Sequence, residues 1–133
     1  MGAWGHGSFA NDSALDWLGD LCEGDPSLVR SALEAVADVD ADEYLEVNEC
    51  CAALAAAELV AAALGKGDDR LDAGAASWLQ EHRAAVQAVD TKLAHRAVER
   101  VFGKSELREL WDEGGPDTEW HTDVRELLIR LAA

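Results

Sequence analysis

An alanine-rich segment near the middle of the chain is the feature that most restricts the possible fold. Residues 52–65 are almost continuously apolar, and alanines recur on all sides of a helical projection (Ala53, Ala56, Ala57, Ala61, Ala62 and Ala63). Alanine is the strongest helix former, and its small side chain lets neighbouring helices approach closely. We therefore predict a central helix over about residues 41–64, which Gly65 ends.

The rest of the chain also has helical periodicity. Apolar residues recur every three or four positions, and no alternating β-branched run is long enough to demand a strand. These patterns predict an all-α fold, a compact bundle of about six or seven helices around the alanine-rich helix. Of the other expected helices, the first starts at Asn11 or Asp12 and stops near Gly24, the second follows Asp25-Pro26, and one lies around Trp78 and Leu79. A further helix runs from Val86 to Phe102 before Gly103, the next follows Ser105 as far as Gly114, and the last starts near Asp117 or Thr118.

Glu58 is the one acidic residue inside the alanine-rich segment. On a helical projection it shares a face with Cys51, Leu54 and Ala62, which places a carboxylate on an apolar stripe. An unpaired buried carboxylate would cost several kcal/mol, so Glu58 must be hydrogen-bonded, paired with an arginine, or protonated. Two interpretations follow: Glu58 is a pocket acid, or it is a structural link to an arginine or to the N-terminal segment.

The N-terminal segment has an unusual composition for a chain terminus. The glycines at positions 2, 5 and 7 allow close backbone approach, and Trp4 and Phe9 offer apolar surface that offsets its ordering entropy only when it docks into a core. We therefore predict that this segment is a glycine/tryptophan plug beside the alanine-rich helix. Its backbone N–H groups, the Trp4 indole and His6 are donors for Glu58.

The same N-terminal block carries a family resemblance. Residues 2–12, Gly-Ala-Trp-Gly-His-Gly-Ser-Phe-Ala-Asn-Asp, resemble the opening Gly-x-Trp-Gly-x-Gly-x-Phe-x-Asn-Asp pattern of the bacterial family known as domain of unknown function 4259. Residues 44–59 and 105–111 are similar to later blocks of that family. Ala10 departs from the family pattern, which has an acidic residue there, so no role of that acid carries over to this chain. The resemblance implies a fold and no activity.

Size, charge and cysteine count narrow the class of protein. At 133 residues and 14.3 kDa the chain fits one domain, residues 1–133. The net charge of −16 repels phosphate backbones, so we expect no nucleic-acid binding. The sequence shows no apolar run of about 18 residues, no secretory signal and an odd number of cysteines, three. We therefore expect a cytoplasmic protein that does not contact membranes, with Cys50 and Cys51 as small core residues.

No catalytic or metal-binding motif is recognisable. The histidines form no His-Glu-x-x-His pattern, no Cys-x-x-Cys pair occurs, and no phosphate-binding loop is present, so we predict no metal site and no cofactor. The candidate functional residues are Trp4, His6, Asn11, Asp12, Asp16 and Glu58.

Two functions remain open at this point. The first is a non-enzymatic acidic module that binds a basic protein, for example as an immunity or antitoxin-like factor. The second is a small-molecule or metal-assisted catalytic pocket that the glycine-rich motif forms with Glu58, Asp12 and Asp16. The sequence leaves the oligomeric state undetermined.

Overall fold

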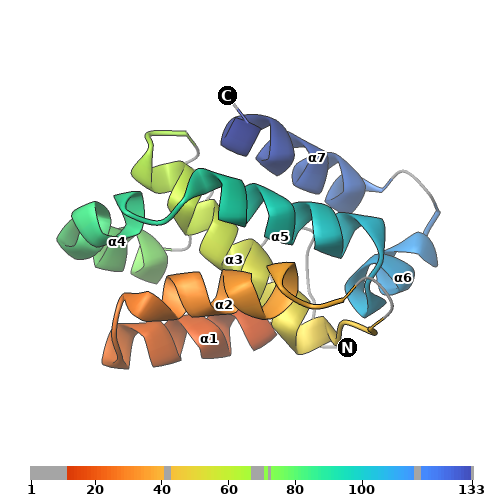
Figure 1. Ribbon diagram of the computed structural model, residues 1–133, viewed down its shortest axis with the longest axis horizontal. Helices are drawn as coiled ribbons and strands as arrows, with labels where there is room; N and C mark the ends of the chain where they lie inside the picture. Colours follow the sequence, from red (N-terminus) through yellow and green to blue (C-terminus); the bar gives the residue numbers. More distant parts are fainter. Residues whose placement is uncertain (1–11, 41–42, 67–70, 72, 116–117, 133) are drawn as a thin grey trace.

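The computed structural model describes residues 12–40, 43–66, 71, 73–115 and 118–132. In these residues the chain forms seven α-helices and no strand, which confirms the predicted all-α fold (Figure 1). The helices are α1 (Asp12–Glu23), α2 (Ser27–Ala37), α3 (Val47–Ala63), α4 (Ala73–Gln87), α5 (Thr91–Gly103), α6 (Glu106–Asp112) and α7 (Glu119–Ala132).

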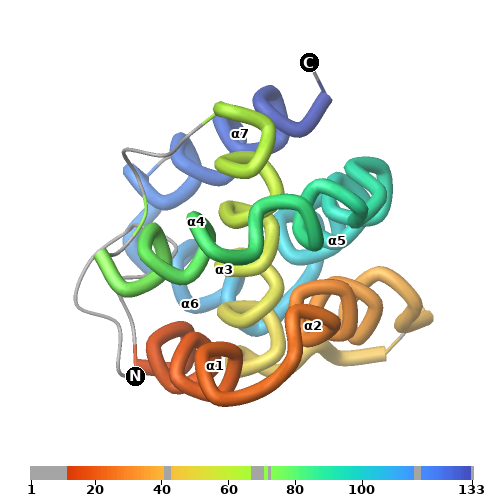
Figure 2. The backbone as a smooth tube through the Cα atoms, turned by 90° about the vertical axis from the view of Figure 1, so that its left-hand side faces the viewer, coloured from red at the N-terminus to blue at the C-terminus, as the bar shows by residue number. Residues whose placement is uncertain are grey.

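Helix α3 runs through the middle of the fold. It packs against every other helix, and 13 of its 17 residues are buried. In both views α1 and α2 lie on one side of α3 and α7 lies on the opposite side (Figures 1 and 2). Alanine side chains end at Cβ, so they allow helices to lie close to α3 around its whole circumference. A helix with an apolar stripe on one side could pack against neighbours on that side only.

The start of α3 differs from the prediction. We expected the helix from about residue 41, and this is wrong, because it begins at Val47 after an extended Glu46. The Val47 N–H donates to Glu106 Oε1 at 2.8 Å, and the Glu106 N–H donates to the Leu45 carbonyl at 3.0 Å. These bonds connect the start of α3 to α6, where the prediction had an additional helical turn. Because the bonded residues are far apart in the sequence, the local periodicity of apolar residues does not indicate them.

The end of α3 agrees with the prediction. Gly65 has a φ of +80°, and the N–H groups of Gly65 and Lys66 bond back to carbonyls of the last helical turn, which is a Schellman motif. Arg83 and Gln87 of α4 donate to the last carbonyls of α3 at 2.7 to 3.1 Å. The carbonyls of the last three residues of α3, Ala61 to Ala63, therefore all accept hydrogen bonds, and cationic Arg83 complements the helix dipole.

The single helix expected over residues 86–102 is in fact two helices. Helix α4 ends at residue 87 and α5 begins at residue 91, because Asp90 accepts the Lys92 N–H at 2.9 Å and caps a new helix. Val86 and Leu93 are both buried in the same core. The apolar stripe therefore continues across the break, which explains why periodicity alone merged the two helices.

Candidate functional site

Glu58 forms a buried ion pair with Arg130 of α7. Arg130 Nη2 lies 2.9 Å from Glu58 Oε1 and Nη1 lies 3.1 Å from Oε2, so both carboxylate oxygens are engaged. The side chains are 6% exposed for Glu58 and 16% exposed for Arg130. Arg130 Nη1 also donates to the Lys66 carbonyl at 3.1 Å. The pair therefore connects α3, α7 and the turn that follows α3.

This geometry selects one of the three states that the sequence allowed for Glu58, namely pairing with an arginine. The sequence did not identify Arg130, which lies 72 residues further along the chain. The proposed donors Trp4 and His6, like the candidate Asn11, lie outside the described residues. The plug and its bonds to Glu58 therefore stay predictions.

Asp12 and Asp16 lie on exposed positions of α1. Asp16 lines a hollow of about 230 Å³ together with Asn48, at the first turn of α3. Asn48 and Glu58 are ten residues apart on that helix, which is about 15 Å along its axis. The structure does not bring Glu58 to this hollow, so the positions of the three acids give no support to a shared catalytic pocket.

A second polar cluster, which the sequence analysis missed, joins α6 to α7. His121 is fully buried, and its Nε2 lies 2.7 Å from Asp112 Oδ1. Its Nδ1 accepts the Thr118 N–H at 3.1 Å and lies 2.7 Å from Thr118 Oγ1. A ring nitrogen that accepts an N–H carries no proton, so Nε2 carries it and donates to Asp112. Hydrogen bonds from His121 and then Arg108 lower the pKa of Asp112.

This cluster combines a hydroxyl, an imidazole and a carboxylate, yet its geometry is that of a helix cap. In a capping box the third residue of a helix accepts the backbone N–H of the residue that precedes the helix, usually through Glu or Gln. His121 does this for Thr118 at the start of α7. Both ring nitrogens are therefore occupied within the protein, and the cluster fixes α7 on α6. The Thr-x-x-His spacing is the signal that could have revealed it.

The two adjacent cysteines of α3 are core residues. Cys50 and Cys51 are buried in the core, as predicted, whereas Cys22 is exposed. Burial raises the pKa of Cys50 to about 11 and that of Cys51 to about 12. Since the thiolate is the nucleophile and the metal ligand, the two buried thiols are unreactive near neutral pH.

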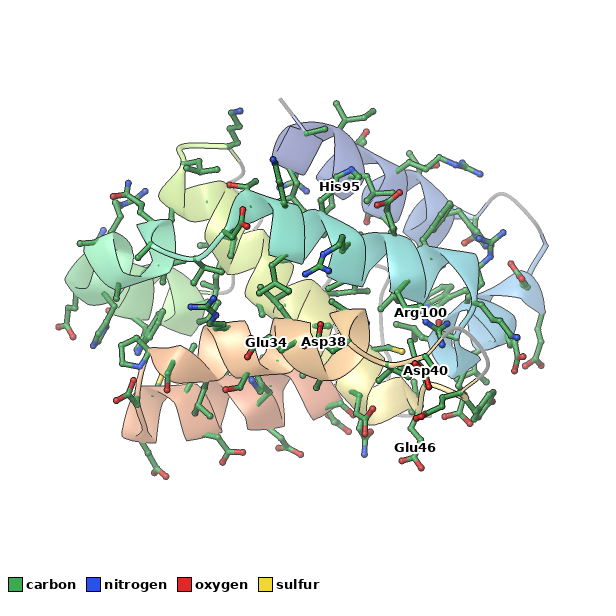
Figure 3. The ribbon with its side chains drawn as sticks, in the orientation of Figure 1. Glu34, Asp38, Asp40, Glu46, His95 and Arg100 are labelled. Atoms are coloured by element: carbon green, nitrogen blue, oxygen red, sulfur yellow. The ribbon has the colours of Figure 1, made fainter. Side chains whose placement is uncertain are left out.

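Acidic residues are distributed unevenly over the fold. Residues 12–49 contain 12 of the 27 acidic residues and one of the 11 basic residues, Arg30. Figure 3 shows Asp38, Asp40 and Glu46 on the α2 side of the molecule. We use the name acidic surface for the exposed carboxylates of α1, of the connections on either side of α2 and of the first turn of α3, which are Asp12, Asp16, Asp20, Glu23, Asp25, Asp38, Asp40, Glu43, Glu46 and Glu49.

Arg100 of α5 positions part of the acidic surface. Its Nη2 donates to the carbonyls of Asp40 at 2.9 Å and Glu43 at 2.7 Å, and its Nη1 donates to the Lys104 carbonyl at 2.6 Å (Figure 3). These bonds hold the connection between α2 and α3 against α5. Because the guanidinium binds backbone carbonyls, the carboxylates of Asp40 and Glu43 stay exposed to solvent.

No group of three or more His, Cys, Asp or Glu side chains in the part of the chain that the structure describes has the arrangement to hold a metal ion. None of the described helices has the length and apolar character to cross a membrane.

Comparison with family models gives a match over residues 2–123, to the family described as domain of unknown function (DUF4259). The chain belongs to this family. The match includes the N-terminal block with the glycine/tryptophan pattern and continues into α7. No curated protein and no solved structure matches the chain.

Proposed function

We propose that this DUF4259 protein is a non-enzymatic binding module whose acidic surface docks a basic protein. The observation that carries the proposal is the concentration of exposed carboxylates on α1, on the connections on either side of α2 and on the first turn of α3, with Arg30 as the one basic residue of residues 12–49. A field of one sign steers an oppositely charged partner and accelerates its association.

Solubility alone explains this arrangement less well. Residues 50–133 contain 15 acidic and 10 basic residues, so most of the charge excess lies in residues 12–49, which have 12 acidic residues and one basic residue. A charge needed only to keep the protein soluble could be spread over the whole surface, since solubility depends on the net charge. The segregation of the excess onto one region instead favours a directional role.

The partner class that fits this surface is a protein with a cationic groove. Nucleases have such grooves because they bind phosphate backbones, and rows of carboxylates can occupy the same positions as phosphates. We therefore favour an immunity or antitoxin-like role against a basic, nuclease-like protein. We place this role in the cytoplasm, where the three free cysteines would stay reduced.

Two variants with equal net charge test the proposal. The first, Asp16→Asn with Asp38→Asn and Glu46→Gln, removes three charges from the acidic surface. Its control, Glu81→Gln with Glu99→Gln and Glu113→Gln, removes three exposed charges from the other part of the chain. Fluorescence anisotropy of a labelled oligolysine of about 20 residues, at low and physiological salt, measures their binding.

We expect the first variant to bind oligolysine about tenfold more weakly and the control to change by less than about twofold. Covalent cross-linking in native lysate should then yield at least one basic protein that the wild type and the control capture and the first variant does not. Equal weakening in both variants would mean that net charge alone governs binding, and the proposal would be wrong.

A further inference from the structure

A hollow with an apolar and a cationic part lies away from the acidic surface. It has a volume of about 570 Å³ and is formed by the end of α3, the first turns of α5 and the end of α7. Helix α7 lies on the opposite side of α3 from α1 and α2 (Figures 1 and 2). This volume is within the range of about 300 to 1,000 Å³ that small-molecule sites occupy.

Three of the residues that line the hollow are apolar, and we call this part of the lining its apolar base. These residues are Leu64, Leu131 and Ala132, and Leu64 is 43% exposed although it is a large aliphatic residue. Leu64 is held there because it directly precedes the glycine that ends α3. An exposed apolar patch with a charged rim is characteristic of a binding site.

The rim is cationic in a strongly acidic protein. Lys92 and Arg96 both line the hollow, together with Thr91 and His95. Figure 3 shows His95 on the side of α5 that faces α7. His95 Nδ1 lies 3.0 Å from Glu99, whereas neither Lys92 nor Arg96 forms an ion pair within the described residues.

The positions of Lys92 and Arg96 are unfavourable for the isolated helix. They are four residues apart on α5, where like charges repel each other. Lys92 also lies in the first turn, where the helix dipole disfavours a cation. Among the described residues, no carboxylate forms an ion pair that would neutralise either charge. A bound anion would remove both penalties.

We propose that this hollow binds a medium-chain alkyl carboxylate of about eight to ten carbons. The alkyl chain would lie on Leu64 and Leu131, and the carboxylate would lie between Lys92 and Arg96. The charge complementarity and the apolar base together select an amphipathic anion over an inorganic anion, which would leave the base unused, and over a neutral lipid, which would leave the cations unpaired. This site is independent of the proposed basic partner.

Isothermal titration calorimetry with acetate, hexanoate, octanoate, decanoate and decanol tests the site. Affinity should rise with chain length by up to about fourfold per methylene, the value for full burial. Decanol should bind at least about tenfold more weakly than decanoate, since it lacks the charge. Decanoate should also shift the backbone amide NMR signals of the residues that line the hollow.

Matched variants identify the residues. Lys92→Gln with Arg96→Gln should weaken decanoate binding about tenfold or more, and Leu64→Ser several-fold. The control, Arg30→Gln with Lys104→Gln, removes two exposed cations elsewhere and should change the affinity by less than about twofold. Circular dichroism verifies that each variant is folded.

The proposal would be overturned by equal binding of decanol and decanoate, by equal affinity of acetate and decanoate, or by a Lys92→Gln, Arg96→Gln variant that binds like the control. A short peptide with a leucine at its free C-terminus is a further competitor. If it bound more tightly than decanoate, the hollow would be a docking site for a protein terminus, and the fatty-acid assignment would be wrong.

Discussion

Replacement of Arg130 by methionine should destabilise the protein by about 3 kcal/mol. Loss of one partner of a buried ion pair costs about 3 to 5 kcal/mol, because the remaining charge is buried without compensation. Glu58 is 6% exposed, so this condition holds, whereas Arg130 is 16% exposed, which favours the lower end of the range. Methionine fills most of the space of the arginine stem, so the change tests the charge and not the packing.

The double variant Glu58→Leu, Arg130→Met separates an unpaired charge from a general packing defect. Replacement of a whole buried pair by apolar residues is often nearly neutral, and the Lys66 carbonyl loses one donor, which costs about 1 kcal/mol. We therefore expect the double variant to lose only about 1 kcal/mol. The resulting coupling energy between the two positions should be about 2 to 4 kcal/mol.

Urea denaturation at neutral pH measures these differences. With a slope of about 2 kcal/mol per molar urea, the single variant Arg130→Met should have a midpoint about 1.5 M lower than the wild type. Arg30 and Glu34 provide a control pair, because their side chains are exposed and Arg30 Nε lies 3.6 Å from Glu34 Oε2. Their coupling energy should be below about 1 kcal/mol. If the double variant were as unstable as Arg130→Met alone, the unpaired carboxylate would not be the cause of the loss, and the reasoning would fail.

Three further outcomes follow from the other parts of the molecule. In native protein at pH 8, a thiol reagent such as DTNB should modify only the exposed Cys22 quickly, whereas in urea it should modify all three cysteines. Rapid modification of a second cysteine in the native protein would contradict the burial of Cys50 and Cys51. The lowered pKa of Asp112 means that its bond to His121 stabilises the fold above the unfolded Asp pKa of about 4 and is lost as pH falls through the folded value. The stability difference between wild type and Asp112→Asn should therefore shrink in acid, and a constant difference in melts from pH 7 to pH 2 would refute this. Deletion of residues 1–7, or Trp4→Ala, should cost about 3 to 5 kcal/mol if the N-terminal block docks as its sequence predicts, and an unchanged urea midpoint would show that it does not.

Local signals predicted most of the fold. Gly65 was recognised as the end of α3 because only glycine adopts a φ of +80° without strain, and the structure has it there. The sequence predicts a helix directly after Asp25-Pro26, and α2 begins at Ser27, whose N–H donates to Asp25 Oδ1 at 2.8 Å. Ser105 likewise accepts the Arg108 N–H at the start of α6. Such interactions span two or three residues, so the sequence contains all the information that they need.

Interactions between distant residues could not be predicted in the same way. The start of α3 depends on Glu106, and the state of Glu58 depends on Arg130, and both partners lie more than 50 residues away. Periodicity states that Glu58 needs a partner but not which one. The break at Asp90 is a different kind of error, since its capping signal was present and a continuous apolar stripe outweighed it.

The positions of the two proposed sites on α3 allow them to be tested separately. The acidic surface includes Glu46 and Glu49 at the first turn of α3, and the hollow includes Leu64 at its end. The 15 residues from Glu49 to Leu64 correspond to about 22 Å along the helix axis, whereas charges in physiological salt are screened over about 8 Å. Direct electrostatic coupling between the cationic rim and the acidic surface should therefore be small. Saturation with decanoate should change the affinity for oligolysine by less than about twofold. A change of about tenfold would correspond to about 1.4 kcal/mol of coupling and would require a conformational change carried by α3.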